Sequence, residues 1–406
     1  MMSPAIKIQQ TRRKIESIWT KNGAEFQAAI NGTLPRFFSA STPDEVENEI
    51  PVFCFHSVEP DLFEQQLRYL ADNGYRTVNS DTLTNAIRGK TSDTARSVAL
   101  TFDDATGSFW AVAFPLLKKY GFSAILFVIP GLVPDVDHAY PTLEDVWQGR
   151  ASYEDVANRE NIQPLCTWPE LLAMHRSGLV DMQAHSLTHA RINISPTVVD
   201  FIHPDFDPYF FNNIAIPVPI NDSVEQPERA LNLGQPIYES ASRLSGRLRF
   251  MEDAQVSAAM IDYVKKEGGA NFFSRPQWRN ELYQQYHLLS AQKTPQTEYE
   301  TTEQAQTAIG LELARSKEIL EQRFEKPIND VCYPWFQGSA FTDMIAVQCG
   351  YRAVYYGLKS SEDISATKNL IKIPRISEEY LFCLPGKGRS RLLKVWGKKI
   401  ASFAKS

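Results

Sequence analysis

Residues 114–128, FPLLKKYGFSAILFV, hold the pattern on which the fold depends. The apolar residues Phe114, Leu116 and Leu117 mark an amphipathic helix that ends at Gly121, and an apolar strand follows at once. Glycine takes the left-handed conformation that commonly ends a helix, so the change from helix to strand is abrupt. The stretch therefore predicts one helix–strand unit of an α/β protein.

The same unit occurs elsewhere along the chain. Predicted helices end at Gly74, Gly178 and Gly350, and the strand candidates 75–78, 179–183 and 351–356 follow them. Further strand candidates lie at 50–56, 97–104 and 370–374. Alternating helices and strands imply a parallel sheet, either open or closed into a barrel.

One long segment interrupts this rhythm. Seven prolines occur between residues 196 and 236, and only a helix near 252–267 is predicted before the long helix at 301–324. We interpret residues 192–297 as an insertion that shapes the substrate cleft. The expected organisation is a helical arm and linker over 1–48, a body over 49–383 and a basic tail over 384–406.

Composition excludes several classes of protein. The 406 residues include 42 basic and 48 acidic side chains, and a net charge of −6 argues against a nucleic-acid binder. A hydrophobic content of 43% excludes global disorder. The five cysteines form no CxxC pair, so neither a disulfide framework nor a thiolate zinc site is expected. Residues 1–30 lack a secretory signal pattern, and the default expectation is a cytoplasmic protein.

Two adjacent carboxylates follow one strand candidate. The segment 97–104, SVALTFDD, is apolar and ends in Asp103 and Asp104. Parallel sheets bind ligands beyond the carboxyl ends of their strands, so a site is expected here. Two neighbouring acids repel each other unless a cation or a proton resolves the charge. In the purely structural alternative, one acid caps the next helix and the other is solvated.

Two histidines follow another strand candidate. His185 and His189 are four residues apart, which on a helical turn places their Cβ atoms about 5–6 Å apart on one face. That spacing lets both imidazoles reach one zinc ion, although a pair of surface histidines is the alternative. With the two acids, they indicate a site of two imidazoles, one carboxylate and an open position, typical of catalytic zinc. The second acid is then free to act as a base.

These motifs resemble those of the polysaccharide deacetylase (NodB-homology) family, carbohydrate esterase family 4. The resemblance rests on TFDD at 101–104 and HSLTH at 185–189, and more loosely on the helix at 312–323 that leads into VCYPW at 331–335. It implies an incomplete (β/α)7-type barrel of mainly parallel strands with a large insertion. It also implies a divalent metal, zinc first and cobalt, nickel or manganese as alternatives, and hydrolysis of an N-acyl group, N-acetyl first, on a sugar or polysaccharide.

The resemblance also implies roles for individual residues. By position in the motifs, Asp103 would be the general base, and Asp104, His185 and His189 would hold the metal. The backbone N–H of Tyr333 would help to stabilise the oxyanion of the intermediate.

Three features depart from the family pattern. Ala105 stands where a glycine usually follows the two acids, and the third motif lacks its arginine. The late motif that supplies the general acid is absent, since no histidine occurs after residue 300. His56 ends the strand candidate at 50–56 and is the candidate that replaces it, because the leaving amine requires a proton. A core histidine with a backbone partner is the alternative.

Other candidates are weaker. Arg375 either replaces the missing arginine, binds an anionic sugar or is a surface residue at a strand end. Cys332 is a candidate nucleophile, but a small, buried apolar role is favoured. We assign no role to the other histidines, which are His138, His175, His203 and His287.

The tail over 384–406 contains seven cations and no acid. Four apolar residues share one face of a predicted helix there, namely Leu392, Trp396, Ile400 and Phe403. Such a helix suits peripheral contact with an anionic membrane or a partner. Packing on the protein's own acidic surface is the alternative.

Taken together, these features predict a metal-dependent N-deacetylase, a hydrolase of non-peptide carbon–nitrogen bonds whose partner is a glycan or an N-acylated sugar. One alternative is deacylation of a lipid-linked or small sugar intermediate in glycan biosynthesis. Another is a non-catalytic glycan-binding relic of the same fold. The presence of both Asp103 and Asp104 argues against a relic, because a binding protein has no use for the base.

Overall fold

The computed structural model describes residues 28, 31–32, 34–46, 49–90, 94–206, 232–291, 298–358 and 369–397. These residues fall into two compact units. The larger unit is drawn from residues 22–187, 313–336 and 346–406, and the smaller one from residues 188–312 and 337–345. The division falls inside the short loop that carries both motif histidines, and this loop is described with the strand before it.

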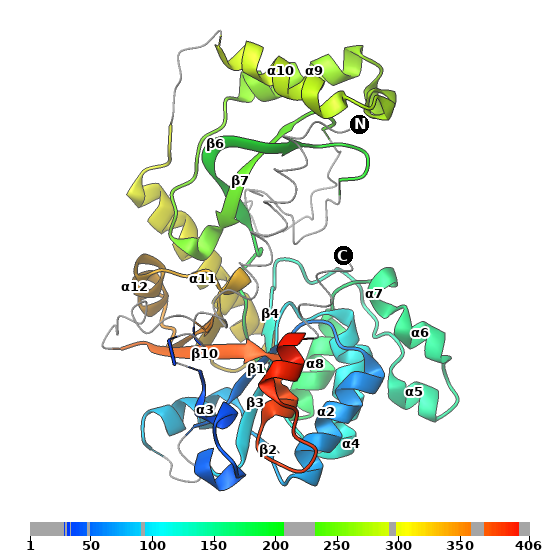
Figure 1. The fold of residues 1–406 in the computed structure, drawn as a ribbon, viewed down its shortest axis with the longest axis vertical. Coiled ribbons are helices and arrows are strands. Elements are labelled where there is room, and N and C mark those ends of the chain that lie inside the picture. Colours follow the sequence, from blue (N-terminus) through cyan, green and yellow to red (C-terminus); the bar gives the residue numbers. More distant parts are fainter. Residues whose placement is uncertain are drawn as a thin grey trace. The chain divides into compact units, whose positions relative to one another are not determined.

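Seven parallel strands close into a barrel in the larger unit (Figure 1). In ring order they are β1 (Val52–Phe55), β3 (Ser97–Phe102), β4 (Ala124–Val128), β5 (Val180–Ala184), β8 (Asp330–Cys332), β9 (Ala353–Gly357) and β10 (Ile371–Ser377). β1 closes the ring because it pairs with both β3 and β10. The two-residue strand β2 (Arg76–Thr77) pairs with the start of β3 outside the ring. The predicted seven-stranded barrel of parallel strands is confirmed.

Helices cover the outside of the barrel, as expected for strands whose residues are buried on both faces. The helices of this layer are α2 (Pro60–Asp72), α3 (Ser80–Ile87), α4 (Phe114–Tyr120) and α8 (Trp168–Arg176). Helix α2 packs against α4 (Figure 1). Helix α8 packs against β5. Gly121 ends α4 with a φ of 69°, and a capping box of Thr167 and Glu170 starts α8. The predicted helix end at Gly121 is therefore confirmed.

In the described chain, further helices lie between strands of the barrel along the sequence. Three short helices precede α8, namely α5 (Leu143–Trp147), α6 (Tyr153–Ala157) and α7 (Arg159–Ile162). Two more follow the insertion, the long α11 (Thr302–Phe324) and α12 (Ala340–Gln348). In the described part of the chain, no helix is long and apolar enough to cross a membrane.

The barrel interior is organised in layers, because side chains along a strand point alternately inward and outward. The middle layer is apolar and includes Ala99, Phe127 and Ile373. Two residues further along the same rows the interior becomes polar, with Thr101 after Ala99 and Arg375 after Ile373. Polar groups therefore gather inside the carboxyl end of the barrel.

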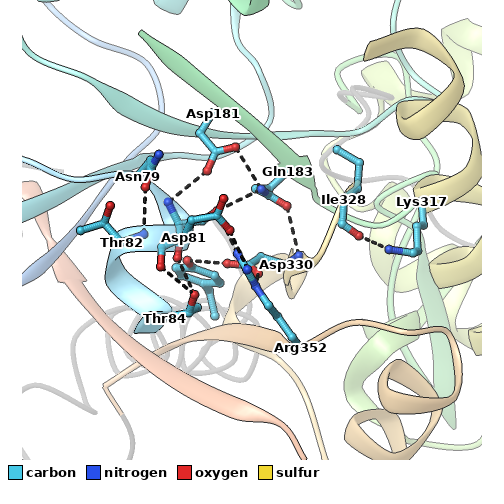
Figure 2. A network of polar contacts seen from close by, with 12 residues as sticks. Asn79, Asp81, Thr82, Thr84, Asp181, Gln183, Lys317, Ile328, Asp330 and Arg352 are labelled. Atoms are coloured by element: carbon cyan, nitrogen blue, oxygen red, sulfur yellow. Dashed lines mark hydrogen bonds and ion pairs between the residues drawn. The ribbon is translucent and has the colours of Figure 1, made fainter. Parts of the chain in front are cut away.

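A second polar network occupies the amino end of the barrel (Figure 2). Asp330 starts β8 and accepts hydrogen bonds from Arg352 Nε at 2.8 Å and from the Tyr355 hydroxyl at 3.0 Å. Gln183 accepts from the Asp330 N–H and donates to Asp181. A cavity of about 680 Å³ adjoins this end of the barrel and is lined in part by Asp181. This end is opposite to the one where ligands of parallel barrels bind.

The smaller unit contains a two-stranded antiparallel sheet, although the prolines predicted no regular structure there. Its strands are β6 (Arg191–Phe201) and β7 (Pro236–Ser242), and its helices are α9 (Ala254–Lys266) and α10 (Trp278–Ala291). Pro196 lies where the pairing register shifts between Asn193 and Val198, and Pro236 is the first residue of β7. Both are positions at which a strand tolerates proline, so the prediction of irregular chain was wrong here.

Parts of the two termini lie beside the barrel. Phe37 is buried within a 3-10 turn (Arg36–Phe38), and the guanidinium of Arg389 donates to the carbonyls of Phe37, Phe38 and Ala40. Further along the tail, Trp396 Nε1 donates to the Tyr380 hydroxyl at 3.1 Å. The predicted N-terminal helix up to residue 27, and Ile400 and Phe403 of the tail, lie outside the described residues.

Candidate active site

The two motif acids leave β3 in different directions. Asp103 continues the inward row of Ala99 and Thr101, and its N–H donates to the carbonyl of Phe55 at 3.0 Å. Asp104 and Ala105 then have φ values of 68° and 53°, which turn the chain sharply. The two consecutive carboxylates thereby contact different partners, Asp103 contacting Arg375 and Asp104 contacting His185.

Arg375 is the partner of Asp103. Its Nη1 lies 2.6 Å from Asp103 Oδ1 and its Nη2 lies 2.8 Å from Oδ2, a bidentate ion pair with both residues buried. Burial by itself raises the pKa of Asp103, but the charges of Arg375 and then His185 outweigh it and hold the pKa well below 3.8. Of the alternatives for Arg375, the surface residue at a strand end is excluded, because only 2% of the residue is exposed.

Two cysteines line the same part of the interior. Cys54 Sγ and Cys332 Sγ lie 3.6 and 3.7 Å from Asp103 Oδ2, and Cys332 Sγ is also 2.8 Å from Arg375 Nη2. Burial raises the pKa of both thiols well above 9, so they remain protonated at neutral pH. A protonated thiol is a poor nucleophile, which supports the packing role favoured for Cys332.

The two motif histidines are brought together by a loop and not by the helical turn that their spacing suggested. Residues 185–190 have no regular structure, and Ser186 and His189 have φ values of 65° and 55°. His185 Nδ1 lies 2.9 Å from the carbonyl of Cys332, while His185 Nε2 lies 3.3 Å from Asp104 Oδ1. The contact with a carbonyl oxygen places the proton on Nδ1, so Nε2 is the nitrogen that could bind a metal ion.

Asp104, His185 and His189 together could hold a metal ion. One potential ligand atom from each lies within 4.8 Å of the other two, and all three side chains are buried. Burial by itself lowers the pKa of His185, but the charges of Asp103 and then Asp104 outweigh it and raise the pKa above 6.5. The negative charge that favours a proton on this buried imidazole also favours a bound cation. Two imidazoles and one carboxylate are a donor set that zinc accepts.

His56 lies at the mouth of the same site. It follows β1, its side chain is 52% exposed, and its Nε2 is 3.8 Å from Asp103 Oδ2. It is therefore not the core histidine of the alternative interpretation. Nearby, the partly buried Glu378 interacts electrostatically with His56 from the end of β10. Glu378 was not among the residues singled out from the sequence, although the pairing of Cys54 with Ser377 brings the two strand ends together.

Tyr333 follows β8 at the same end of the barrel. Its N–H donates to the carbonyl of Tyr355 at 3.3 Å, which is a long hydrogen bond. The next residue, Pro334, has no N–H, and Trp335 and Phe336 have φ values of 53° and 57°. An oxyanion at this place would compete with the Tyr355 carbonyl for the Tyr333 N–H.

Backbone strain is concentrated around this group of residues. Eight non-glycine residues in the described chain have positive φ, and six of them lie in the loops after β3, β5 and β8. The six are Asp104, Ala105, Ser186, His189, Trp335 and Phe336. Such conformations cost about 1–3 kcal/mol each and persist mainly where function requires them. The strained backbone therefore marks the same site as the sequence motifs, and it does so independently of them.

The described fold is a closed parallel barrel whose carboxyl end carries an Asp–His–His cluster beside an ion-paired aspartate. Residues 90–200, which include the four motif acids and histidines, match the family model described as polysaccharide deacetylase. The resemblance of this chain to the polysaccharide deacetylase (NodB-homology) family is thereby confirmed. His56, Tyr333 and Arg375 lie outside the matched segment.

Individual proteins resemble parts of the chain. The poly-beta-1,6-N-acetyl-D-glucosamine N-deacetylase of Escherichia coli strain K12 is 28% identical over 149 residues, which cover 37% of this chain and 20% of that protein. The chain thus matches about a fifth of the length of this curated relative.

Two solved structures also resemble the chain. A de-N-acetylase from Aggregatibacter actinomycetemcomitans has 13% identity and a TM-score of 0.48 and covers 85% of this chain and 99% of its own. The BpsB deacetylase domain from Bordetella bronchiseptica has 13% identity and a TM-score of 0.46, and the match covers 81% of this chain and 96% of that domain. Both TM-scores are below 0.5, so these likenesses assign no role to any residue here.

Proposed function

We propose that the protein is a metal-dependent N-deacetylase, a hydrolase that removes N-acetyl groups from sugar residues. The observation that carries the proposal is the close approach of Asp104, His185 and His189 beside an aspartate that is already paired with Arg375. One carboxylate thus belongs to a potential metal site while its neighbour remains an ionised base. Metal-assisted hydrolysis of an amide requires both a ligand for the ion and a base that accepts the proton of the attacking water.

Asp104, His185 and His189 hold the ion in this proposal, and zinc is the metal that the donor set suits best. When bound, the ion polarises the acyl carbonyl and acidifies the attacking water. Asp103 accepts the proton from that water. Arg375 orients the carboxylate of Asp103 through its two hydrogen bonds and keeps it ionised.

Two further groups complete the reaction. His56 protonates the departing amine, since it is exposed and its Nε2 lies 3.8 Å from the base. The Tyr333 N–H donates to the developing oxyanion and exchanges its 3.3 Å bond to the Tyr355 carbonyl for this charge-assisted one. Collapse of the intermediate then releases acetate and the free amine of the sugar.

The proposed substrate is a polymer of N-acetylglucosamine, by analogy with the E. coli relative, a poly-beta-1,6-N-acetyl-D-glucosamine N-deacetylase. This substrate is favoured over a lipid-linked intermediate because the described part of the tail contacts the protein itself. In the described part of the tail, Val395 is buried and Trp396 bonds to Tyr380. These contacts favour packing of the tail on the protein itself.

The test compares Asp103→Asn with His185→Ala in the full chain. Asp103→Asn should keep its bound metal and lose nearly all turnover, because the base is removed and the ligands remain. His185→Ala should lose both. Metal content by mass spectrometry and amine release from an N-acetylglucosamine oligomer measure the two properties. Normal turnover by Asp103→Asn, or full metal content in His185→Ala, would refute the assignment.

A further inference from the structure

We propose that Glu312 and Ser316 of α11 are positioning residues that set the geometry of the loop carrying His185 and His189. The inference rests on the proposed function, because it assumes that these histidines bind a metal. Glu312 and Ser316 are four residues apart and therefore lie on the same face of the helix, one turn from each other. Both lie on the helix that leads into the third motif, and the sequence assigned a role to neither of them.

Each side chain holds one of the residues between the histidines. Thr188 Oγ1 lies 2.5 Å and Thr188 N lies 3.0 Å from the two carboxylate oxygens of Glu312. Ser316 Oγ donates to the carbonyl of Ser186 at 2.9 Å. All four residues are buried, with exposed fractions of 5% or less. Hydrogen bonds to a buried carboxylate are short and strong, so the helix fixes both the backbone and a side chain of the loop.

The loop depends on such contacts because its own backbone is unfavourable. Ser186 and His189 both have positive φ without being glycine, and residues 185–190 take part in no helix or strand ladder. A backbone in this state persists only where its surroundings hold it. On its other side, the Gly131 N–H donates to the Leu187 carbonyl at 2.9 Å, and a Cβ on Gly131 would come within 2.5 Å of that oxygen. The loop is thus held from both sides.

The positions of the histidine nitrogens follow from this loop. A metal site tolerates little displacement of its ligands, and loss of the partners that orient ligands typically lowers metal affinity about 10–100-fold. Glu312→Ala should therefore weaken zinc binding by about 10–100-fold. Glu312→Gln retains one acceptor oxygen and should restore part of the affinity. Ser316→Ala removes a single hydrogen bond and should have a smaller effect in the same direction.

The experiment measures Zn²⁺ affinity by competition with a chromophoric chelator in the full chain, together with the melting temperature of the metal-free protein. Glu318→Ala is the matched control, because Glu318 is on the same helix but exposed, and its partners Arg315 and Gln322 belong to that helix and not to the histidine loop. The control should bind zinc like the wild type. A positioning role requires that zinc affinity decreases from the wild type to Glu312→Gln and decreases further in Glu312→Ala. The decrease must be larger than the loss of stability of the metal-free proteins, measured by their melting temperatures, explains.

Two outcomes overturn the inference in distinguishable ways. If the wild type binds zinc and Glu312→Ala binds it as tightly while melting earlier, Glu312 only supports the fold, and the proposed function stands. If the wild type itself binds no zinc, the proposed metal site fails, and the positioning role fails with it. Should Glu312→Ala not fold, Glu312→Gln and Ser316→Ala decide, and unchanged zinc affinity in both would refute the role.

Discussion

At the scale of single residues, Arg375 explains how the site works without the arginine of the third motif. The guanidinium arrives from β10 and reaches Asp103 from across the barrel interior. Ile373 and Arg375 share one inward-facing row, so the sequence contains the signal that would have identified this residue. An arginine two positions after a core residue at the end of an interior strand belongs inside the barrel.

Arg375→Lys should raise the pKa of Asp103 and so shift the acidic limb of the pH–rate profile upward. Burial raises the pKa of Asp103, and Arg375 is the foremost charge that lowers it. Lysine keeps the charge but cannot pair with both oxygens, so the pKa rises and the base is ionised only at higher pH. We expect a shift of about one pH unit in kcat/KM. Arg352→Lys, which alters a pair at the opposite end of the barrel, should leave the limb in place. An unmoved limb in Arg375→Lys would contradict the pairing role.

His56→Ala should lower the rate of amide hydrolysis by about 10²–10⁴-fold while metal content stays unchanged. The reason is that an amine leaves only after it gains a proton, and His56 is the exposed histidine beside Asp103. Activated esters have leaving groups that require no proton, so their hydrolysis should be nearly unaffected. Parallel kinetic measurements on both substrate types check this. Equal losses on both would mean that His56 binds substrate or supports the site instead.

At the scale of elements, the loops after β3, β5 and β8 combine short length with unfavourable backbone. Ala105→Gly should stabilise the protein by up to about 1 kcal/mol. The left-handed conformation at a φ of 53° destabilises the folded protein by about 1–2 kcal/mol when the residue is alanine. Glycine removes this strain, but its greater conformational entropy in the unfolded chain offsets part of the gain. Free energies of unfolding in urea measure the change.

Ala113→Gly is the control for this substitution. Ala113 is also buried but has a φ of −66°, so glycine should destabilise the protein there by about 1 kcal/mol. Destabilisation by both substitutions would mean that Ala105 is not strained.

The elements also show where sequence patterns reach their limit. Helix ends were predictable because a glycine marks them, as Gly121 does after α4. The spacing of His185 and His189 was informative, but the same spacing fits a helical turn or a strained loop, and only the structure distinguishes them. The contact between Glu312 and Thr188 links residues 124 positions apart, and no local pattern reports such a pair.

At the scale of the whole molecule, the barrel is polar at both ends of its apolar middle layer. The repeating helix–strand order predicted this architecture, because parallel strands with helical crossovers allow few arrangements. It did not predict at which strand ends charged side chains lie inside the barrel. At the carboxyl end the charges form the candidate active site, and at the amino end they form the network around Asp330 (Figure 2).

The amino-end network should make stability depend on pH through Asp330. Burial raises the pKa of Asp330 from 3.8 to about 6 even though Arg352 and Tyr355 bond to it. Between these two values the folded protein holds more protons than the unfolded chain, so this group adds stability as the pH falls and withdraws it as the pH rises through 6. From pH 7 to pH 5 the gain should be about 1 kcal/mol.

The Asp330→Asn variant cannot titrate at this position, so it should lack this gain. Urea unfolding at pH 5, 6 and 7 should show that the free energy of unfolding of the wild type increases relative to that of the variant as the pH falls. Asp155→Asn is the control, because the Ser152 hydroxyl and then its N–H lower the pKa of Asp155 below 3.8. The contribution of Asp155 is complete above that value, and its difference from the wild type should stay level between pH 5 and 7. If wild type and Asp330→Asn instead follow parallel curves over this range, Asp330 is already ionised at pH 5, and its ion pair with Arg352 compensates fully for its burial.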